Sequence, residues 1–187
     1  MPSFTKKAIL ESFLALLAKK PLEKITVRDI VDDCGVNRNT FYYYFQDTYA
    51  VVEELCRMAE EQIPQNETLG ASLSALFAAL ADFAAAHPRA MRHLLASIGR
   101  DGAERCLGET VEHVAAECLT RAAGKPLTRE QLDLPVTALR HAFLGTCVDW
   151  IRVDKHPDAD AFAARMRRLL DLYAAAILAE MQTKSPE

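Results

Sequence analysis

Glycine and aromatic residues are both scarce in this chain. Its 187 residues include only 7 glycines, and aromatic side chains make up 7% of the total. No segment shows the sustained alternation of apolar and polar residues, rich in β-branched side chains, that is typical of strands. Apolar residues recur instead at helical spacing. The sequence therefore predicts an all-α fold.

Residues that could build a disulfide framework, a metal centre or a catalytic site occur only in unpaired patterns. The 5 cysteines include no CxxC pair, and the 5 histidines show no HExxH spacing. No catalytic triad, phosphate-binding loop or carboxylate pair can be assembled. We therefore expect buried, reduced thiols, no metal, no cofactor and no enzymatic activity.

Long hydrophobic runs are also missing. No stretch of 18 uncharged apolar residues occurs, which argues against a membrane span. Near the N-terminus, Glu11 interrupts the apolar stretch, and no small-residue cleavage site precedes the polar segment that follows. We expect a cytoplasmic protein with no membrane partner.

The net charge of −4 does not show the excess of positive charge that is typical of nucleic-acid binding. Residues 1–46 nevertheless carry 7 Lys and Arg against 5 Asp and Glu, and the remaining residues carry 15 against 21. This mild asymmetry fits a small head that can approach phosphate groups and a larger acidic body.

Capping and helix-breaking residues divide the chain into short N-terminal and longer C-terminal helices. Thr26, Asn37 and Thr128 are expected N-caps. Breaks are expected at residues 99–102 and 156–157. The predicted helices span roughly residues 5–19, 26–34, 37–45, 48–63, 69–87, 91–98, 107–124, 128–153 and 160–181.

The segment 25–47, which reads ITVRDIVDDCGVNRNTFYYYFQD, is the most informative part of the sequence. It contains two short predicted helices joined at Gly35, where the absence of a Cβ permits a sharp left-handed turn. Two helices joined in this way are a helix-turn-helix candidate.

The second of these helices carries five consecutive aromatic residues, which cannot all face one core because each step rotates by about 100°. Phe41 and Phe45 share a face and are expected to be buried. Tyr43 is expected to pack rather than to contact a partner. Tyr42 and Tyr44 are expected to reach phosphate oxygens.

The same segment resembles the DNA-binding segment of the TetR/AcrR family of bacterial transcriptional regulators. The resemblance rests on the apolar-Thr-Val start, the Gly-Val turn, the Asn-rich helix start and the Thr-Phe-Tyr-Tyr-Tyr-Phe run before an acidic residue. It is specific over residues 25–47 and looser over 5–55. It implies a helix-turn-helix DNA-binding domain at 1–47 and a helical effector-binding and dimerisation domain at 48–187, connected by the helix of about 48–63.

The resemblance also implies which side chains contact double-stranded operator DNA, with the helix 37–45 lying in the major groove. For Arg28, a solvated surface charge is an equal alternative. The family usually has a lysine where this chain has Thr48, so we expect modest affinity per head or a shallow salt dependence. The expected DNA-binding residues are Thr26, Arg28, Asn37, Arg38, Asn39, Thr40, Tyr42, Tyr44 and Thr48.

Two further sites are implied for the C-terminal domain, and for each a plain role in the core remains the alternative. The expected residues of a pocket for an unknown small-molecule effector are Phe77, Phe83, Met91, Leu95, His113, Cys118 and His141. The expected residues of a homodimer interface, formed by the last two long helices, are Phe143, Trp150, Phe162, Leu169, Leu170 and Tyr173.

The sequence is thus interpreted as a ligand-responsive, homodimeric transcriptional repressor that a small molecule releases from its operator. Two alternatives stay open. One is a TetR-like co-activator that works through a protein partner, and the other is a helical small-molecule-binding protein without a DNA function.

Overall fold

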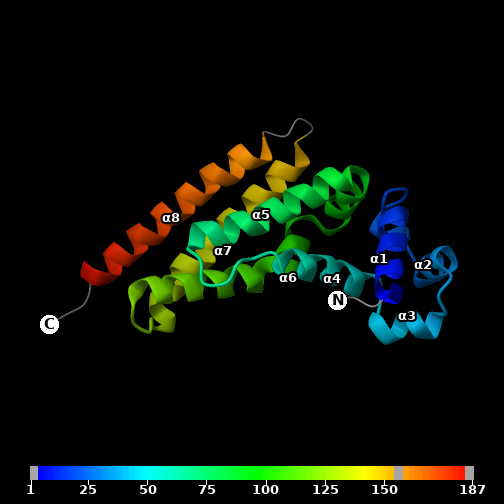
Figure 1. Cartoon of the computed structure of the whole chain (residues 1–187), viewed down its shortest axis with the longest axis horizontal. Coiled ribbons are helices and arrows are strands. Elements are labelled where there is room, and N and C mark those ends of the chain that lie inside the picture. Colours follow the sequence, from blue (N-terminus) through cyan, green and yellow to red (C-terminus); the bar gives the residue numbers. More distant parts are fainter. Residues whose placement is uncertain (1–3, 154–157, 184–187) are drawn as a thin grey trace.

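The computed structural model describes residues 4–153 and 158–183. No strand occurs in these residues, so the predicted all-α fold is confirmed. The N-terminal head consists of α1 (Phe4–Leu17), the 3-10 helix η1 (Leu22–Lys24), α2 (Val27–Cys34) and α3 (Arg38–Tyr44). The body consists of α4 (Thr48–Glu60), α5 (Leu69–Ala86), α6 (Pro88–Ala123), α7 (Arg129–Arg152) and α8 (Ala159–Thr183). The head lies at one end of the elongated body, and the C-terminal end of α8 lies at the other (Figure 1).

Polar side chains begin several helices where the sequence predicts. The Thr26 hydroxyl accepts a hydrogen bond from the Asp29 N–H, and the Asn37 side chain accepts one from the Asn39 N–H at 2.8 Å. Thr128 begins α7 in a capping box. These bonds satisfy N–H groups that have no partner within the first helical turn. The three predicted N-caps are therefore confirmed.

Helix α6 differs from the prediction. Two helices separated by a break at 99–102 were expected, whereas α6 runs from Pro88 to Ala123 with one kink at Gly99, where φ is 60° and ψ is −159°. This conformation is accessible essentially only to glycine. Gly102 lies within the helix, and a Cβ added there would clash with the Ile98 side chain. The break expected at 156–157 lies outside the described residues.

The body is held together by α5 packed along α8 and α6 packed along α7. At its centre the Phe77 ring lies edge-on to Trp150, with 5.2 Å between ring centroids, and 5.0 Å from the Phe162 ring. By length and composition alone α5 could cross a membrane, but half of it is buried inside the protein. It therefore serves as the central helix of the body.

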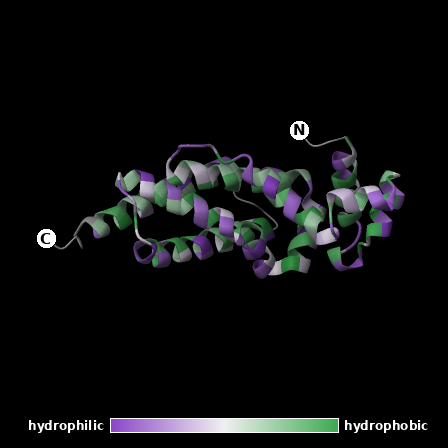
Figure 2. Cartoon of the chain, turned by 90° about the horizontal axis from the view of Figure 1, so that it is seen from below, coloured by the Kyte–Doolittle hydropathy of each residue, from purple (hydrophilic) through white to green (hydrophobic). Residues whose placement is uncertain are grey.

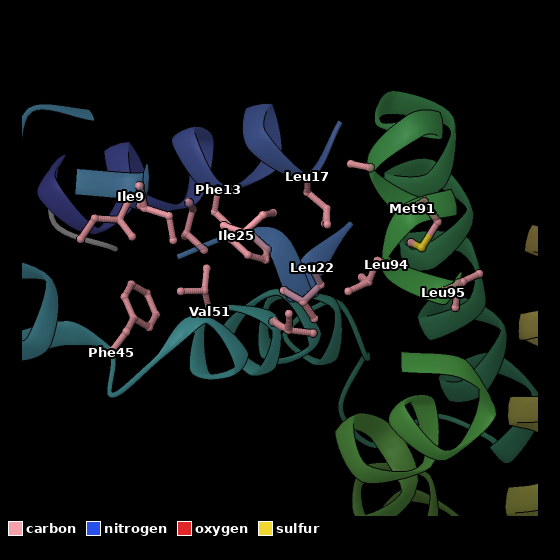
Figure 3. Close-up of a cluster of buried hydrophobic side chains, with 14 of the residues drawn as sticks. Ile9, Phe13, Leu17, Leu22, Ile25, Phe45, Val51, Met91, Leu94 and Leu95 are labelled. Atoms are coloured by element: carbon pink, nitrogen blue, oxygen red, sulfur yellow. The ribbon is translucent and has the colours of Figure 1, made fainter. Parts of the chain in front are cut away.

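One hydrophobic core joins the head to the body. Figure 3 shows side chains of α6 facing those of α1 and η1, with Leu94 next to Leu22. The head and body are therefore packed together rather than tethered by a loop. The buried residues of this core include Ile9, Phe13, Leu17, Leu22, Ile25, Phe45, Val51, Met91, Leu94 and Leu95.

Candidate DNA-binding and effector sites

Helices α2 and α3 form the helix-turn-helix that the sequence predicts. Gly35 ends α2 in the left-handed conformation, with φ at 71°, and its N–H donates to the Val31 carbonyl. An added Cβ at Gly35 would meet no other atom within 4 Å, so backbone conformation alone requires glycine here. The turn sets α3 across the end of the head, where Figure 1 shows it lying at the outer edge.

The apolar face of α3 anchors the helix. Phe41 and Phe45 are both buried, and their ring centroids lie 5.8 Å apart. Tyr44 is half-buried and packs on the same core. The expected burial of the two phenylalanines is therefore confirmed, and it fixes which side of α3 faces away from the head.

The outward side of α3 carries an ordered basic and aromatic pair. The Arg38 guanidinium donates to the Tyr42 hydroxyl at 3.1 Å and lies 5.5 Å from the centre of the Tyr42 ring. Asn39 beside it is exposed, and Thr40 is half-buried. Because Arg38 is held against the ring, it loses less conformational freedom when it binds an anion or a base edge.

Tyr43 does not pack as expected. Its side chain is 81% exposed, more than Tyr42 at 45%, and its ring forms an edge-to-face contact with the Tyr44 ring, with 5.0 Å between centroids. The 100° rotation per residue explains this exposure, because Phe41 and Phe45 occupy the inward face. Sequence reasoning therefore missed Tyr43 as a candidate contact residue.

Thr26 is committed to holding the start of α2. Its N–H and its hydroxyl both donate to Asp29 Oδ2, at 2.8 and 2.7 Å. The N–H of Thr26 is therefore engaged within the capping box. A hydrogen bond from Lys20 and those from Thr26 lower the pKa of Asp29 from 3.8 to about 2. The ionised capping box positions α2, and Thr26 acts through it.

The remaining predicted contacts lie around this pair of helices. Arg28 is exposed on α2 beside Asp32, with 3.4 Å between the guanidinium and the carboxylate. Thr48 is half-buried in the first turn of α4, where Asp47 is the N-cap and accepts from the Ala50 N–H at 2.9 Å.

A cavity of about 360 Å³ lies in the body directly behind the head. It is bounded by α4, α5, α6 and α7, and α6 contributes residues from both sides of the Gly99 kink. Its walls are almost entirely apolar, with Gln62 and Asp82 at exposed positions. The apolar lining includes Val52, Leu55, Leu80, Phe83, Met91, Leu95, Ile98, Leu107, Leu144 and Ile151.

Three of the seven expected effector residues line this cavity, namely Phe83, Met91 and Leu95. The other four lie elsewhere. Phe77 packs on Trp150, and Cys118 is buried beside Ser72. His113 and His141 are both exposed and pair with Glu117 and Glu104, respectively. These four residues sit on other faces of their helices, which helical spacing alone could not distinguish from the cavity face.

The helices that line the cavity also hold the head. In the first part of α6, the His93 ring contacts the Leu17 carbonyl at 2.7 Å. The Ser97 hydroxyl accepts from the Leu22 N–H at 3.2 Å. In α4, buried Glu54 binds Lys6 of α1 at 2.8 Å. A change in the cavity can therefore reach the head through two helices.

The expected dimer residues divide between the core and the surface. Phe143, Trp150 and Leu170 are buried within this chain, and Phe162 is half-buried. The Tyr173 hydroxyl donates to the Pro135 carbonyl of its own chain at 2.8 Å.

Leu169 alone of the expected dimer residues is largely exposed, at 66%, and Leu172, which the sequence did not single out, is exposed to the same extent. With Ala176 and Ala179 they form a stripe along the outer side of α8 at coiled-coil spacing. Figure 2 shows hydrophobic residues continuing to the C-terminal end of this helix.

Comparison with known proteins accounts for the head. Residues 9–55 match the family model of bacterial regulatory proteins, tetR family. These residues are a TetR-family domain. The uncharacterized HTH-type transcriptional regulator YxbF of Bacillus subtilis is 28% identical over 61 residues. That similarity covers 33% of this chain and only 16% of YxbF, so the two are comparable over a small part of YxbF's length.

Solved structures extend the TetR-family fold to the body. A tetR-family transcriptional regulator from Streptomyces coelicolor is similar with a TM-score of 0.62 and 16% identity, covering 97% of this chain and 93% of that one. The fatty acid degradation regulator FadR from Bacillus halodurans is similar with a TM-score of 0.59 and 16% identity, covering 91% and 96%. At these identities the similarity concerns the fold, and the chain has the fold of TetR-family transcriptional regulators.

Proposed function

We propose that this chain is a homodimeric transcriptional repressor that is released from operator DNA by an apolar small molecule. In this proposal residues 1–47 bind DNA, and residues 48–187 bind the effector and the second subunit. The protein works in the cytoplasm and carries out no enzymatic step. The observation that carries the proposal is the apolar cavity between α4 and α6, the two helices that also hold the helix-turn-helix head.

The DNA contact is assigned to the exposed face of α3 and the residues around it. Arg38 and Asn39 suit base edges in the major groove, and Tyr42 suits a phosphate. The set extends to Arg28, Asn37, Thr40, Tyr43, Tyr44 and Thr48, with Thr26 positioning α2.

Two heads are needed because one short recognition helix reads only a few base pairs. The exposed stripe of Leu169 and Leu172 on α8 supplies an apolar face for a second copy. The inner side of α8 packs with α7 on the core that contains Phe77 and Trp150, so the stripe lies on the opposite, outer side of α8. We assign the dimer interface to this stripe, with Phe162 at its edge, and leave the buried Phe143, Trp150 and Leu170 to the core.

The effector is assigned to the cavity on the basis of its lining. A site of this size and apolarity binds a compact hydrophobic molecule. Two regulators of similar fold are named for roles in the degradation of apolar compounds. FadR is a fatty acid degradation regulator, and AlkX of Dietzia is a repressor implicated in biodegradation of n-alkanes. The ligand class proposed here rests on the cavity walls of this chain.

A gel-shift assay with the DNA upstream of the protein's own gene tests the proposal. The purified protein should retard this fragment and leave an unrelated fragment of equal length unbound at physiological salt. Mass spectrometry of the same preparation, first under native and then under denaturing conditions, should detect a co-purifying apolar molecule. If none co-purifies, native mass spectrometry should detect the complex with an added one. Failure to retard any promoter fragment, together with ligand binding, would favour the small-molecule-binding protein without a DNA function.

A further inference from the structure

A second hollow adjoins the apolar cavity on the outside of the body. It has a volume of about 520 Å³ and is bounded by the end of α5, the start of α6 and the end of α7. Met91, Leu95 and Ile151 line both spaces, so these three side chains form a shared wall. The hollow is open to solvent at several exposed positions. Its remaining apolar lining consists of Ala84, Ala85, Pro88, Ala96 and Val153.

Two arginines give this hollow its charge, and we call it the arginine groove. Arg92 lies near the start of α6, Arg152 is the last residue of α7, and both side chains are exposed. Within residues 4–153 and 158–183, neither guanidinium has an ion-pair or hydrogen-bond partner, and no carboxylate lines the groove. Two positive charges on one concave surface create a potential that attracts an anion.

The other spaces of the body differ from the arginine groove in charge. A hollow at the start of α7 carries Arg129 together with Asp133, and another beside the start of α5 carries Arg121 together with Asp171. The described lining of the apolar cavity contains no lysine, arginine or histidine, and Asp82 lies at an exposed position on it. An anion is therefore favoured in the groove and disfavoured in the cavity behind the shared wall.

The arginine groove lies away from the proposed DNA-reading face. At the C-terminal end of α1 the Leu17 carbonyl contacts His93 of α6, whereas Lys6 near its start lies 5.7 Å from the centre of the Phe45 ring at the end of α3. Helix α1 has 14 residues and is therefore about 20 Å long. Figure 1 shows the corner between α5 and α6 at the upper end of α1 and α3 at its lower end. The anion that the groove holds is therefore not a phosphate of DNA bound to α3.

We propose that the arginine groove is a second ligand site, which binds a small amphipathic carboxylate by its head at Arg92 and Arg152 and by its hydrocarbon chain along the shared wall. Guanidinium groups bind carboxylates through paired N–H donors. Each methylene that leaves water strengthens binding by up to about fourfold. The volume of the groove lies within the range of small-molecule sites, about 300–1,000 Å³. This inference goes beyond the function proposed above, because it concerns a different space and requires no DNA.

Methionine methyl groups distinguish the groove from the cavity. Met91 lines both spaces, Met58 lines the cavity alone, and Met166 lines neither. In full-length protein labelled with [methyl-13C]methionine, decanoate below its micelle concentration should shift the Met91 signal and leave those of Met58 and Met166 in place. Decylamine, which carries a positive charge on a chain of the same length at neutral pH, should not produce this pattern. A joint shift of Met58 and Met91 by decanoate would place the chain in the cavity and overturn the proposal.

Substitution of the arginines tests the carboxylate contact. The affinity for decanoate is read from the concentration that gives half of the Met91 shift. Arg92→Gln and Arg152→Gln should each weaken binding by up to about fivefold, and the double variant by about tenfold. Arg129→Gln removes the same charge at the other end of α7 and should bind like the wild type. Wild-type affinity in the double variant, or an equal loss in Arg129→Gln, would overturn the assignment.

The apolar contact is tested from the ligand and from the protein. Octanoate, which is two methylenes shorter, should bind more weakly than decanoate by up to about 15-fold, and equal affinities would contradict a chain lying on the shared wall. Ala85→Phe places a ring in the groove without changing either arginine or the lining of the cavity. This variant should lose the Met91 response, while unchanged Met58 and Met166 signals show that it is folded. A retained response in Ala85→Phe would exclude the groove as the binding site.

A second copy of the chain is the competing occupant of the groove. Analytical ultracentrifugation of the Arg92→Gln and Arg152→Gln double variant distinguishes the two. The proposal predicts an unchanged oligomeric state. A change from dimer to monomer, together with no Met91 shift in the wild type on addition of decanoate, would make the groove a protein interface and refute the ligand site.

Discussion

The kink in α6 depends on a backbone conformation that only glycine adopts easily, so Gly99→Ala is a direct test of its structural role. At φ 60° and ψ −159° a residue with a Cβ is strained by up to about 3 kcal/mol. No atom lies within 4 Å of the position of an added Cβ, so no steric clash adds to this strain. Alanine also reduces the entropy of the unfolded chain, which returns about 1 kcal/mol. The expected net loss is about 2 kcal/mol.

Gly124→Ala is the matched control. Gly124 ends α6 in the left-handed helical region, at φ 65° and ψ 10°, and it too has nothing within 4 Å of an added Cβ. The strain there is about 1–2 kcal/mol, which leaves a net loss of about 1 kcal/mol or less. Urea unfolding at one fixed protein concentration measures both. Equal losses, or a more stable Gly99→Ala protein, would refute the reasoning that the backbone conformation at Gly99 requires glycine.

Four further predictions concern the head, the body and the proposed interface. Thr26→Ala should cost about 1 kcal/mol in urea unfolding through the lost capping box. The pKa of Asp29 is lowered to about 2 in the folded state, so its charge stabilises the protein above about pH 4 and this contribution is lost as the pH falls towards 2. The free energy of unfolding of Asp29→Asn should therefore fall less between pH 4 and pH 2 than that of the wild type. Phe77→Ala should cost about 4 kcal/mol, because the ring is buried against two aromatic rings. Leu169→Glu with Leu172→Glu should give monomers in analytical ultracentrifugation with unchanged helicity, and a dimer that survives both changes would contradict the assigned face.

Local sequence signals predict the head of this protein well. Thr26, Asn37 and Gly35 act through hydrogen bonds and backbone preferences within a few residues, so their roles can be deduced from neighbouring positions. The burial of Phe41 and Phe45 follows from helical rotation in the same way. The exposure of Tyr43 follows from that rotation too, once the buried face of α3 is known.

The body could be predicted only in outline. Its helices carry apolar residues on more than one face, so spacing does not distinguish the cavity from the core or from the surface. Phe77 and Leu95 illustrate this, because both are buried but only Leu95 lines the cavity. Cys56 and Cys106 are 50 positions apart, and only the packing of α4 on α6 makes both of them line the same cavity.

Trp150 shows the same limit for the interface. The sequence favours it as a dimer contact, whereas its ring lies between Phe77 and Phe162 inside its own chain. A charge at this position would therefore disturb the monomer core, and a loss of dimer in such a variant would say little about the interface. The exposed Leu169 and Leu172 are the informative positions.

The central claim, that the outward face of α3 reads DNA, is tested most directly by fluorescence anisotropy with a labelled fragment from upstream of the gene. Arg38→Ala removes the ordered guanidinium, and Arg129→Ala removes an exposed arginine at the start of α7 as a control for net charge. We predict that Arg38→Ala weakens specific binding by about 1–3 kcal/mol, or about 5- to 150-fold, while Arg129→Ala binds like the wild type. Wild-type affinity in the Arg38→Ala protein, or equal losses in both variants, would contradict the account.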